Sequence, residues 1–297
     1  MRTARRLSRL LARRGDQPSI RAFASLAALR RWAVEFRPGL SHIVCVGGDA
    51  TLSAAAPAAI RTGTPFVPVP NGFGNLFARV FRFPDRAEAV PALLETGTVR
   101  RVDVGVVAND PDGEIFLSHR SFGVLEQIQT MAEQRRQQPR NRLLRYLWYY
   151  AVAYDFAFRK RLSGFAVEVD GRRVADDAVV VTVANVETYR GFLPLTPTAS
   201  PIDGLFDVAV IPRMSKAALG RQLVWLLLRL PGRWRGLRLH RGRRVTVTTP
   251  RRREELRVSR RALPLLVPTG AIEALTRRTV EETEALRGPD DPRDRSG

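Results

Sequence analysis

The chain has 297 residues, about twice the usual length of a single domain, and 44% of them are hydrophobic, which is enough to build cores and excludes wholesale disorder. Its one cysteine, Cys45, excludes a disulfide framework and a cysteine-based zinc site. The 49 basic and 29 acidic residues give a formal net charge of +20, which favours anionic partners such as nucleic acid, acidic phospholipid or nucleotide phosphates.

Residues 1–15 predict a short basic amphipathic helix, because leucines recur among arginines at helical spacing. Two interpretations are open for this helix. It either docks on a membrane surface or serves in targeting, or it packs its leucines on a sheet and leaves its arginines in solvent. A short strand at 20–23 and a helix at 25–36, capped by Ser25, are predicted next.

The following segment alternates apolar strands, glycine turns and helices. Strands are predicted at 42–46 and 65–69, and the helices at 51–60 and 76–83 come after them. Strand, glycine turn and helix, repeated once, are typical of an α/β layered domain with a parallel sheet. We expect this α/β domain to span residues 1–98.

The sequence pattern changes at residue 99, where short strand-like segments separated by turn residues predict a second, β-rich domain over 99–268. Helical insertions are expected at 142–162 and 216–230. We expect a last helix at 271–286 that packs back on the first domain, and a disordered tail at 287–297. The predicted strands lie at 99–108, 114–122, 164–170, 178–185, 205–211, 245–248 and 263–267.

The end of the first buried strand carries the chemistry-bearing residues Gly47, Gly48, Asp49, Ala50 and Thr51. Glycines at this edge of a parallel sheet let backbone N–H groups approach phosphate oxygens, and the next helix directs its positive end to the same place. A carboxylate beside a bound phosphate can hold Mg²⁺ or orient an attacking hydroxyl. The alternative is a plain strand-to-helix turn.

A second glycine turn, Pro70-Asn71-Gly72-Phe73-Gly74-Asn75, ends the next strand and opens another helix. Two turns of a size that suits phosphate are therefore expected side by side. Asn75 either caps the second helix or contacts the ligand.

The order of these motifs resembles the catalytic domain of the diacylglycerol and sphingosine lipid kinases, where they usually read GGDGT and PxGTGNDFAR. Residues 102–105 (VDVG) and 203–208 (DGLFDV) resemble further motifs of that family, and the ordered set covers roughly residues 40–270. NAD kinases share the first motif, but residues 70–79 follow the lipid-kinase pattern.

The resemblance implies an α/β, two-domain NAD kinase/diacylglycerol kinase-like fold: a Rossmann-like domain and a β-sandwich domain with the active site between them. It implies ATP and Mg²⁺ as cofactors and a lipid hydroxyl as the acceptor. Asp49 corresponds to the family's catalytic aspartate. Asp203 and Asp207 map onto a stretch that can hold a structural Mg²⁺ in bacterial members, and a turn role for Asp203 stays open. The nucleotide-binding residues would be Gly47, Gly48, Asp49, Thr51, Asn71, Gly72, Gly74 and Asn75.

Four departures from the family pattern stand against an active kinase. Ala50 replaces a glycine, which would be costly if the backbone there were left-handed, and Phe73 replaces a threonine that can bond the nucleotide. An Asn-Pro-x-Ser-Gly turn is missing from residues 1–20, and an Asp-Gly-Glu motif is missing from 256–263, where Glu254 and Glu255 look like a solvated strand end. The alternative is therefore a family member that binds nucleotide or lipid without efficient turnover.

The expected partner is a lipid substrate at an anionic membrane surface. Without a recognised nucleic-acid motif, we expect no specific nucleic-acid partner, and a homodimer is left open. Because no apolar stretch approaches the ~18 residues that span a bilayer and no secretory segment follows the basic start, we expect a cytoplasmic, peripherally membrane-associated protein. The apolar helix at 216–230 with the arginines after it is either buried or lipid-facing.

Overall fold

The computed structural model describes most of the chain, in segments that are separated by gaps. The predicted helix at 142–162, most of that at 216–230, the residues from 288 onward and Phe73 lie outside the described residues. The described residues are 2–72, 74–110, 113–123, 125–126, 164–188, 195–213, 215, 218, 236–249 and 252–287.

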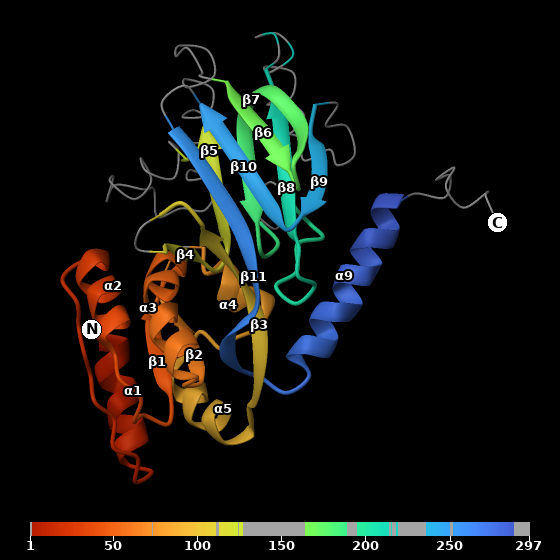
Figure 1. The fold of residues 1–297 in the computed structure, drawn as a ribbon. Coiled ribbons are helices and arrows are strands. Elements are labelled where there is room, and N and C mark those ends of the chain that lie inside the picture. Colours follow the sequence, from red (N-terminus) through yellow and green to blue (C-terminus); the bar gives the residue numbers. More distant parts are fainter. Residues whose placement is uncertain are drawn as a thin grey trace.

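The first half of the molecule, built mainly from residues 2–96, places helices around a small parallel sheet (Figure 1). Strands β1 (Ile43–Gly47) and β2 (Phe66–Pro70) pair in parallel, and the carboxyl end of each leads into one of the two glycine turns. The helices of this half are α1 (Arg2–Ala12), α2 (Leu26–Glu35), α3 (Asp49–Thr62), α4 (Leu76–Val80), the 3-10 turn η1 (Ala87–Ala89) and α5 (Val90–Thr96).

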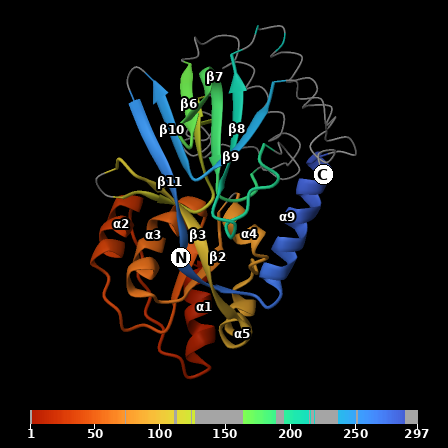
Figure 2. The ribbon, with the colours of Figure 1, turned by 45° about the vertical axis from the view of Figure 1, so that its right-hand side comes forward.

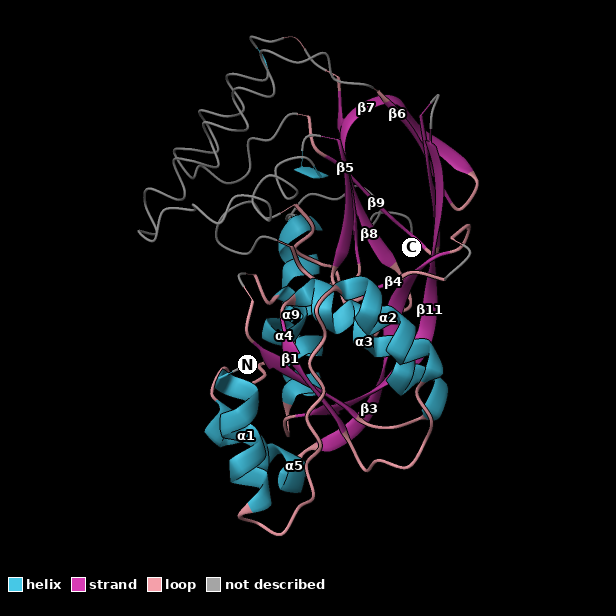
Figure 3. Cartoon of the chain, turned by 90° about the vertical axis from the view of Figure 1, so that its left-hand side faces the viewer, coloured by secondary structure: helices cyan, strands magenta, loops and turns pink. Residues whose placement is uncertain are grey.

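The second half is built from strands that enclose a separate core (Figure 3). These strands are β3 (Thr98–Val107), β4 (Ile115–Phe116), β5 (His119–Gly123), β6 (Phe165–Val169), β7 (Arg172–Ala184), β8 (Phe206–Pro212), β9 (Arg238–Gly242), β10 (Arg244–Thr249) and β11 (Arg252–Val267). Helix α9 (Ala271–Arg287) follows them. The strand order is β1-β2-β11-β10-β6-β7-β8-β9, with β3 and β4 attached through β11 and β5 attached through β7.

Strand β11 belongs to both halves (Figures 1 and 2). It pairs with β10 over its first residues, with β3 along most of its length, and with β2 at Leu265 and Phe66. Its register against β3 shifts between Ser259 and Leu263, which marks a β-bulge where the strand passes from one half to the other. The sheet is therefore continuous across the molecule.

The two hydrophobic cores follow this division. The first lies between the helices and β1, β2 and the ends of β3 and β11, and it includes Ala271 and Leu275 of α9. The second fills the β-rich half, where Phe116 stacks on Phe206 with ring centroids 5.5 Å apart. The two-domain α/β fold with a β-rich second domain is confirmed, while the boundaries at residues 98 and 268 stay predictions.

Most of the predicted elements of the first half are present. Ser25 caps α2 by accepting a hydrogen bond from the Ala28 amide at 3.2 Å. The strand predicted at 20–23 is wrong: these residues form no regular element, and Phe23 packs its ring on Trp32 instead. In α1 the leucines Leu7 and Leu11 are buried, as the packing interpretation expects, but the helix lies mainly against η1 and α5 and not against a sheet.

Candidate functional site

The first glycine turn connects β1 to α3. A Cβ on Gly47 would lie 2.5 Å from Cβ of Thr51, so the first turn of α3 folds directly over this residue. Gly48 is the N-cap residue of α3 and provides no side chain, so the first amides of that helix have no side-chain cap. Ala50 lies exposed in α3 and is not among the residues with positive φ, so the predicted backbone cost of its Cβ does not arise.

The second glycine turn connects β2 to α4 and is held by Asn75. This residue adopts the left-handed conformation with φ 50° and ψ 41°. Its side chain accepts a hydrogen bond from the Gly72 amide and donates one to the Gly72 carbonyl, both at 2.9 Å. Asn75 is therefore the N-cap residue of α4 by position, but its side chain closes the turn instead of capping the helix.

The two turns pack directly against each other. A Cβ on Gly72 would lie 2.5 Å from Cα of Gly48, and the Asn71 amide donates to the Gly47 carbonyl at 2.9 Å. Only residues without a side chain allow this approach. Gly74 is less confined, because a Cβ there would first meet Asp49 at 3.5 Å.

Asp49 joins the two turns through its carboxylate. Its two oxygens accept hydrogen bonds from the amides of Leu76 and Phe77, each at 3.0 Å, so a residue of α3 caps the N-terminus of α4. Burial raises the pKa of Asp49 above its usual range, while these backbone hydrogen bonds and the Arg79 charge oppose the rise. The side chain that the sequence assigns to catalysis thus also has a structural task.

The turns face the β-rich half of the molecule. Ser53, in the first turns of α3, accepts a hydrogen bond from the Leu117 amide at 3.1 Å. The buried Asn185 side chain then donates to the carbonyls of Leu117 and Asp103 at 2.9 and 3.0 Å. The predicted nucleotide-binding residues therefore lie where the two halves meet.

This arrangement suits a phosphate group bound with a metal. The uncapped first amides of α3 are hydrogen-bond donors for an anion, and the helix dipole adds to that attraction. Among the residues that the structure describes, no three or more His, Cys, Asp or Glu side chains gather as a metal site. Mg²⁺ bound with a nucleotide needs only one or two carboxylates, because phosphates and water supply its other ligands, so Asp49 fits that role.

Asp203 and Asp207 lie in the second half and share one partner. Arg241 donates its Nε to Asp207 at 2.8 Å and its Nη2 to Asp203. Burial raises the pKa of both carboxyl groups, and the Arg241 charge opposes the rise in each. The turn role left open for Asp203 is also present, since it accepts a hydrogen bond from the Leu205 amide at 2.9 Å.

Two acidic residues differ from what the sequence suggested. Glu254 is not a solvated strand end: only 6% of it is exposed, and it forms a bidentate pair with Arg120 at 3.1 and 3.2 Å. Asp103 is 1% exposed, and its carboxylate accepts hydrogen bonds from the amides of Gly204 and Arg261, both at 2.7 Å. No role was predicted for Asp103, although a single carboxylate among the apolar residues and glycine of 102–107 is a usable signal.

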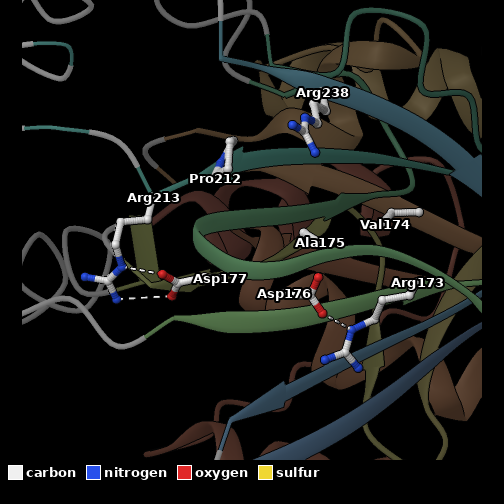
Figure 4. A pocket seen from close by; sticks show the side chains of 8 residues that line it. All are labelled: Arg173, Val174, Ala175, Asp176, Asp177, Pro212, Arg213 and Arg238. Atoms are coloured by element: carbon white, nitrogen blue, oxygen red, sulfur yellow. Dashed lines mark hydrogen bonds and ion pairs between the residues drawn. The ribbon is translucent and has the colours of Figure 1, made fainter.

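A shallow hollow on the β-rich half lies away from these residues (Figure 4). Arg213 pairs with Asp177 across it, and Arg173 pairs with Asp176. Both pairs are largely exposed, so they contribute little to stability. The hollow is lined by Arg173, Val174, Ala175, Asp176, Asp177, Pro212, Arg213 and Arg238.

Comparison with known protein families finds two matches in succession. Residues 1–107 match the diacylglycerol kinase catalytic domain, and residues 121–259 match the YegS C-terminal NAD kinase beta sandwich-like domain. The junction between the two matches falls among the strands β3 to β5, beside the glycine turns.

Curated relatives and solved structures are similar to the chain at low identity. A diacylglycerol kinase of Mycobacterium tuberculosis is 26% identical over 185 residues, which are 62% of this chain and 59% of the relative. One of Bacillus subtilis is 25% identical over 59% of this chain and 56% of the relative, so the chain spans less than two thirds of both. A crystal structure of a diacylglycerol kinase from Bacillus anthracis str. Sterne shares the fold, with a TM-score of 0.65, 16% identity and coverage of 90% of this chain and 92% of that one.

Proposed function

The chain belongs to the diacylglycerol kinase family, and from this premise we propose that it transfers the γ-phosphoryl group of ATP to a hydroxyl of diacylglycerol or a related lipid alcohol. In this reaction the lipid oxygen forms a bond to the γ-phosphorus, the bond from that phosphorus to the bridging oxygen breaks, and ADP leaves. The observation that carries the proposal is the close packing of two glycine turns at the ends of neighbouring parallel strands, inside the residues that match the catalytic domain.

In this proposal the turns bind and orient the phosphates of ATP. The uncapped amides at the start of α3 donate to phosphate oxygens, while contact between Gly48 and Gly72 holds the second turn in place. Thr51 packs over Gly47, and Asn71 directly precedes Gly72. Both belong to the predicted nucleotide-binding residues. Mg²⁺, when bound with ATP, would neutralise the charge that develops on the phosphates.

Asp49 is the proposed catalytic residue. Its pKa is raised by burial, and a carboxylate whose pKa lies nearer to neutrality is a better general base for the lipid hydroxyl. Its hydrogen bonds to Leu76 and Phe77 fix its orientation. The hydroxyl proton would pass to this carboxylate as the new bond to phosphorus forms.

The lipid would be reached at the surface of an anionic membrane. The net charge of +20 supports attraction to such a surface. Among the helices that the structure describes, none has the length and hydropathy to cross a bilayer. Peripheral association is the mode of membrane contact that we propose, and the net positive charge is the observation that supports it.

The test is transfer of label from γ-labelled ATP to lipid in mixed vesicles that contain diacylglycerol. We expect the wild-type protein to form labelled phospholipid and Asp49→Asn to reduce the rate at least about 100-fold, the usual scale for losing one strong transition-state contact. Because Asp49 also caps α4, the substitution will lower the melting temperature as well.

The matched control is Ser25→Ala, which removes the cap of α2 away from the turns. A lost cap costs about 1 kcal/mol, so this variant should be destabilised yet keep its transfer rate at a temperature where both variants are folded. Equal losses of activity in the two variants would contradict a catalytic role for Asp49.

A second candidate function is binding of nucleotide or lipid without efficient turnover. One observation favours it: both oxygens of the Asp49 carboxylate already accept hydrogen bonds from α4. Calorimetry with Mg²⁺-loaded ATP separates the two candidates. Heat of binding without labelled lipid product would support the second, and heat together with product would support the first.

A further inference from the structure

Arg241 spans the two carboxylates that the family resemblance assigns to a structural metal ion. It lies on β9 directly opposite Asp207 of β8 in the antiparallel pair. Its Nε donates to Asp207 Oδ1 at 2.8 Å, and its Nη2 donates to Asp203 Oδ2. The planar guanidinium group thus points one nitrogen at each acid.

The remaining oxygens of the two carboxylates also have donors. Asp203 Oδ1 accepts from the Leu205 amide at 2.9 Å, and Asp207 Oδ2 accepts from the Thr198 hydroxyl. All four carboxylate oxygens are therefore hydrogen-bonded by the protein itself. A carboxylate oxygen with one hydrogen bond can still accept another, so it is the Arg241 guanidinium that excludes the metal: its positive charge already bridges the two acids where a divalent cation would need them as ligands.

The charges lead to the same conclusion. The side chain of Asp207 is only 4% exposed, and a buried carboxylate needs a positive charge close by. Arg241 brings that charge while the far side of its own side chain stays in contact with solvent, with 40% of the side chain exposed. An arginine remains protonated throughout the physiological pH range and does not dissociate as a metal ion does.

We propose that the Arg241 guanidinium group takes the place of the divalent cation between Asp203 and Asp207, so that the fold of the β-rich half does not depend on a metal ion at this position. Asp203 and Asp207 each form an ion pair with Arg241, and these two pairs link the turn before β8, and β8 itself, to strand β9.

The first measurement is the melting temperature of the wild-type protein without nucleotide or lipid, in EDTA and in millimolar MgCl₂ at matched ionic strength. We expect the two melting temperatures to agree within about 1 °C. If Mg²⁺ raises the wild-type melting temperature and Asp203→Asn abolishes that rise, a metal binds here and the proposal is overturned. Neither result depends on kinase activity.

The second measurement uses Arg241→Met, which keeps much of the apolar stem and removes the charge. We expect the melting temperature to fall by roughly 5 °C or more, since leaving a buried charge unpaired is costly in a protein of this size. Millimolar MgCl₂ or CaCl₂ should restore part of the loss. A variant that keeps the wild-type melting temperature, or one that no metal restores, would overturn the proposal.

The matched control is Arg213→Met, which removes an arginine of the same half whose pair with Asp177 is largely exposed. We expect little change in its melting temperature and no response to metal. If Arg241→Met does not fold, the double variant Asp203→Asn/Arg241→Met lowers the uncompensated negative charge by one and should recover folded protein. Its failure to do so would overturn the assignment.

Discussion

Asp49 has two roles, of which one is expected from the sequence and the other is visible only in the structure. Its position after two glycines predicts a carboxylate beside a bound phosphate that holds Mg²⁺ or orients an attacking hydroxyl, and the structure adds a cap for α4 through two amides. That cap joins residues 27 and 28 positions apart. It depends on the parallel pairing of β1 and β2, so no local sequence pattern could have predicted it. By contrast, the cap formed by Ser25 is local and was predicted.

Replacing Gly72 with alanine should destabilise the protein because its Cβ would lie 2.5 Å from Cα of Gly48. A backbone atom cannot move aside easily, and overpacking of this kind costs about 1–3 kcal/mol. We expect a lower free energy of unfolding in urea and weaker binding of ATP in calorimetry. Gly74→Ala is the matched substitution, since its Cβ meets nothing closer than 3.5 Å. Equal destabilisation by both would show that the turns do not pack this closely.

His119 should make stability fall as the pH is lowered. Burial lowers the pKa of His119 from its usual 6.5 to about 4. Between these values the unfolded chain binds a proton that the folded protein does not, so acid favours unfolding below pH 6.5 until the folded protein is protonated near pH 4. The loss amounts to at most about 3 kcal/mol.

His119→Gln tests this prediction, because glutamine cannot titrate. The difference in unfolding free energy between the variant and the wild-type protein should change with pH between 7 and 4.5, in favour of the variant at acid pH. Differences are needed because the raised pKa values of Asp49, Asp203 and Asp207 act with the opposite sign in both proteins. Parallel pH curves would contradict the prediction.

At the scale of elements, periodicity predicted the helices α1 to α4 and α9, but it predicted no strand at β9 and only the last residues of β11. The start of β11 reads as a charged segment because Glu254 occupies an inward position, where it pairs with Arg120, a residue 134 positions away in the sequence. Among the strands that the structure describes, β9 pairs with β8 alone, and it carries exposed arginines, so it lacks an alternating apolar pattern. Both strands are specified by contacts remote in sequence.

Arg261→Gly should relieve backbone strain at the β-bulge of β11. Arg261 has φ 48°, a conformation that costs a residue with a Cβ about 1–2 kcal/mol and costs glycine almost nothing. Its amide donates to Asp103, so the backbone must keep this shape. We expect the melting temperature to rise by about 1–3 °C after the greater flexibility of unfolded glycine is subtracted. Arg257→Gly, in the regular part of the same strand, should lower it.

At the scale of the whole molecule, the ordered motifs identified both halves, yet the sequence did not show how they are joined. The link consists of β11 running through both, the hydrogen bonds of Asp103, and Asn185 between two carbonyls. Each of these side chains bonds backbone groups from other segments, so even where a lone polar residue such as Asp103 stands out, the sequence does not show which groups it bonds. The glycine turns could be predicted because their residues are contiguous.

The net charge of +20 should make binding to anionic vesicles a property of the whole molecule at low salt. At about 0.01 M ionic strength the screening length is near 30 Å, so arginines on different faces act together. In cosedimentation we expect strong binding to vesicles with about 30% anionic lipid, little binding to neutral vesicles, and a steep loss by about 0.5 M NaCl, where screening is short.

Two triple variants test whether the charge of the whole molecule or one basic face is responsible for binding to anionic vesicles. Arg5, Arg9 and Arg13 are exposed and belong to α1 or follow it directly, opposite the buried leucines, whereas Arg100, Arg101 and Arg257 are exposed on β3 and β11. Replacing either set with glutamine removes three charges. If the whole field attracts the membrane, both variants should lose affinity to a similar extent, at about 1 kcal/mol or less per charge. A loss confined to the α1 variant would instead identify the basic face of α1 as the docking surface and would contradict binding by overall charge.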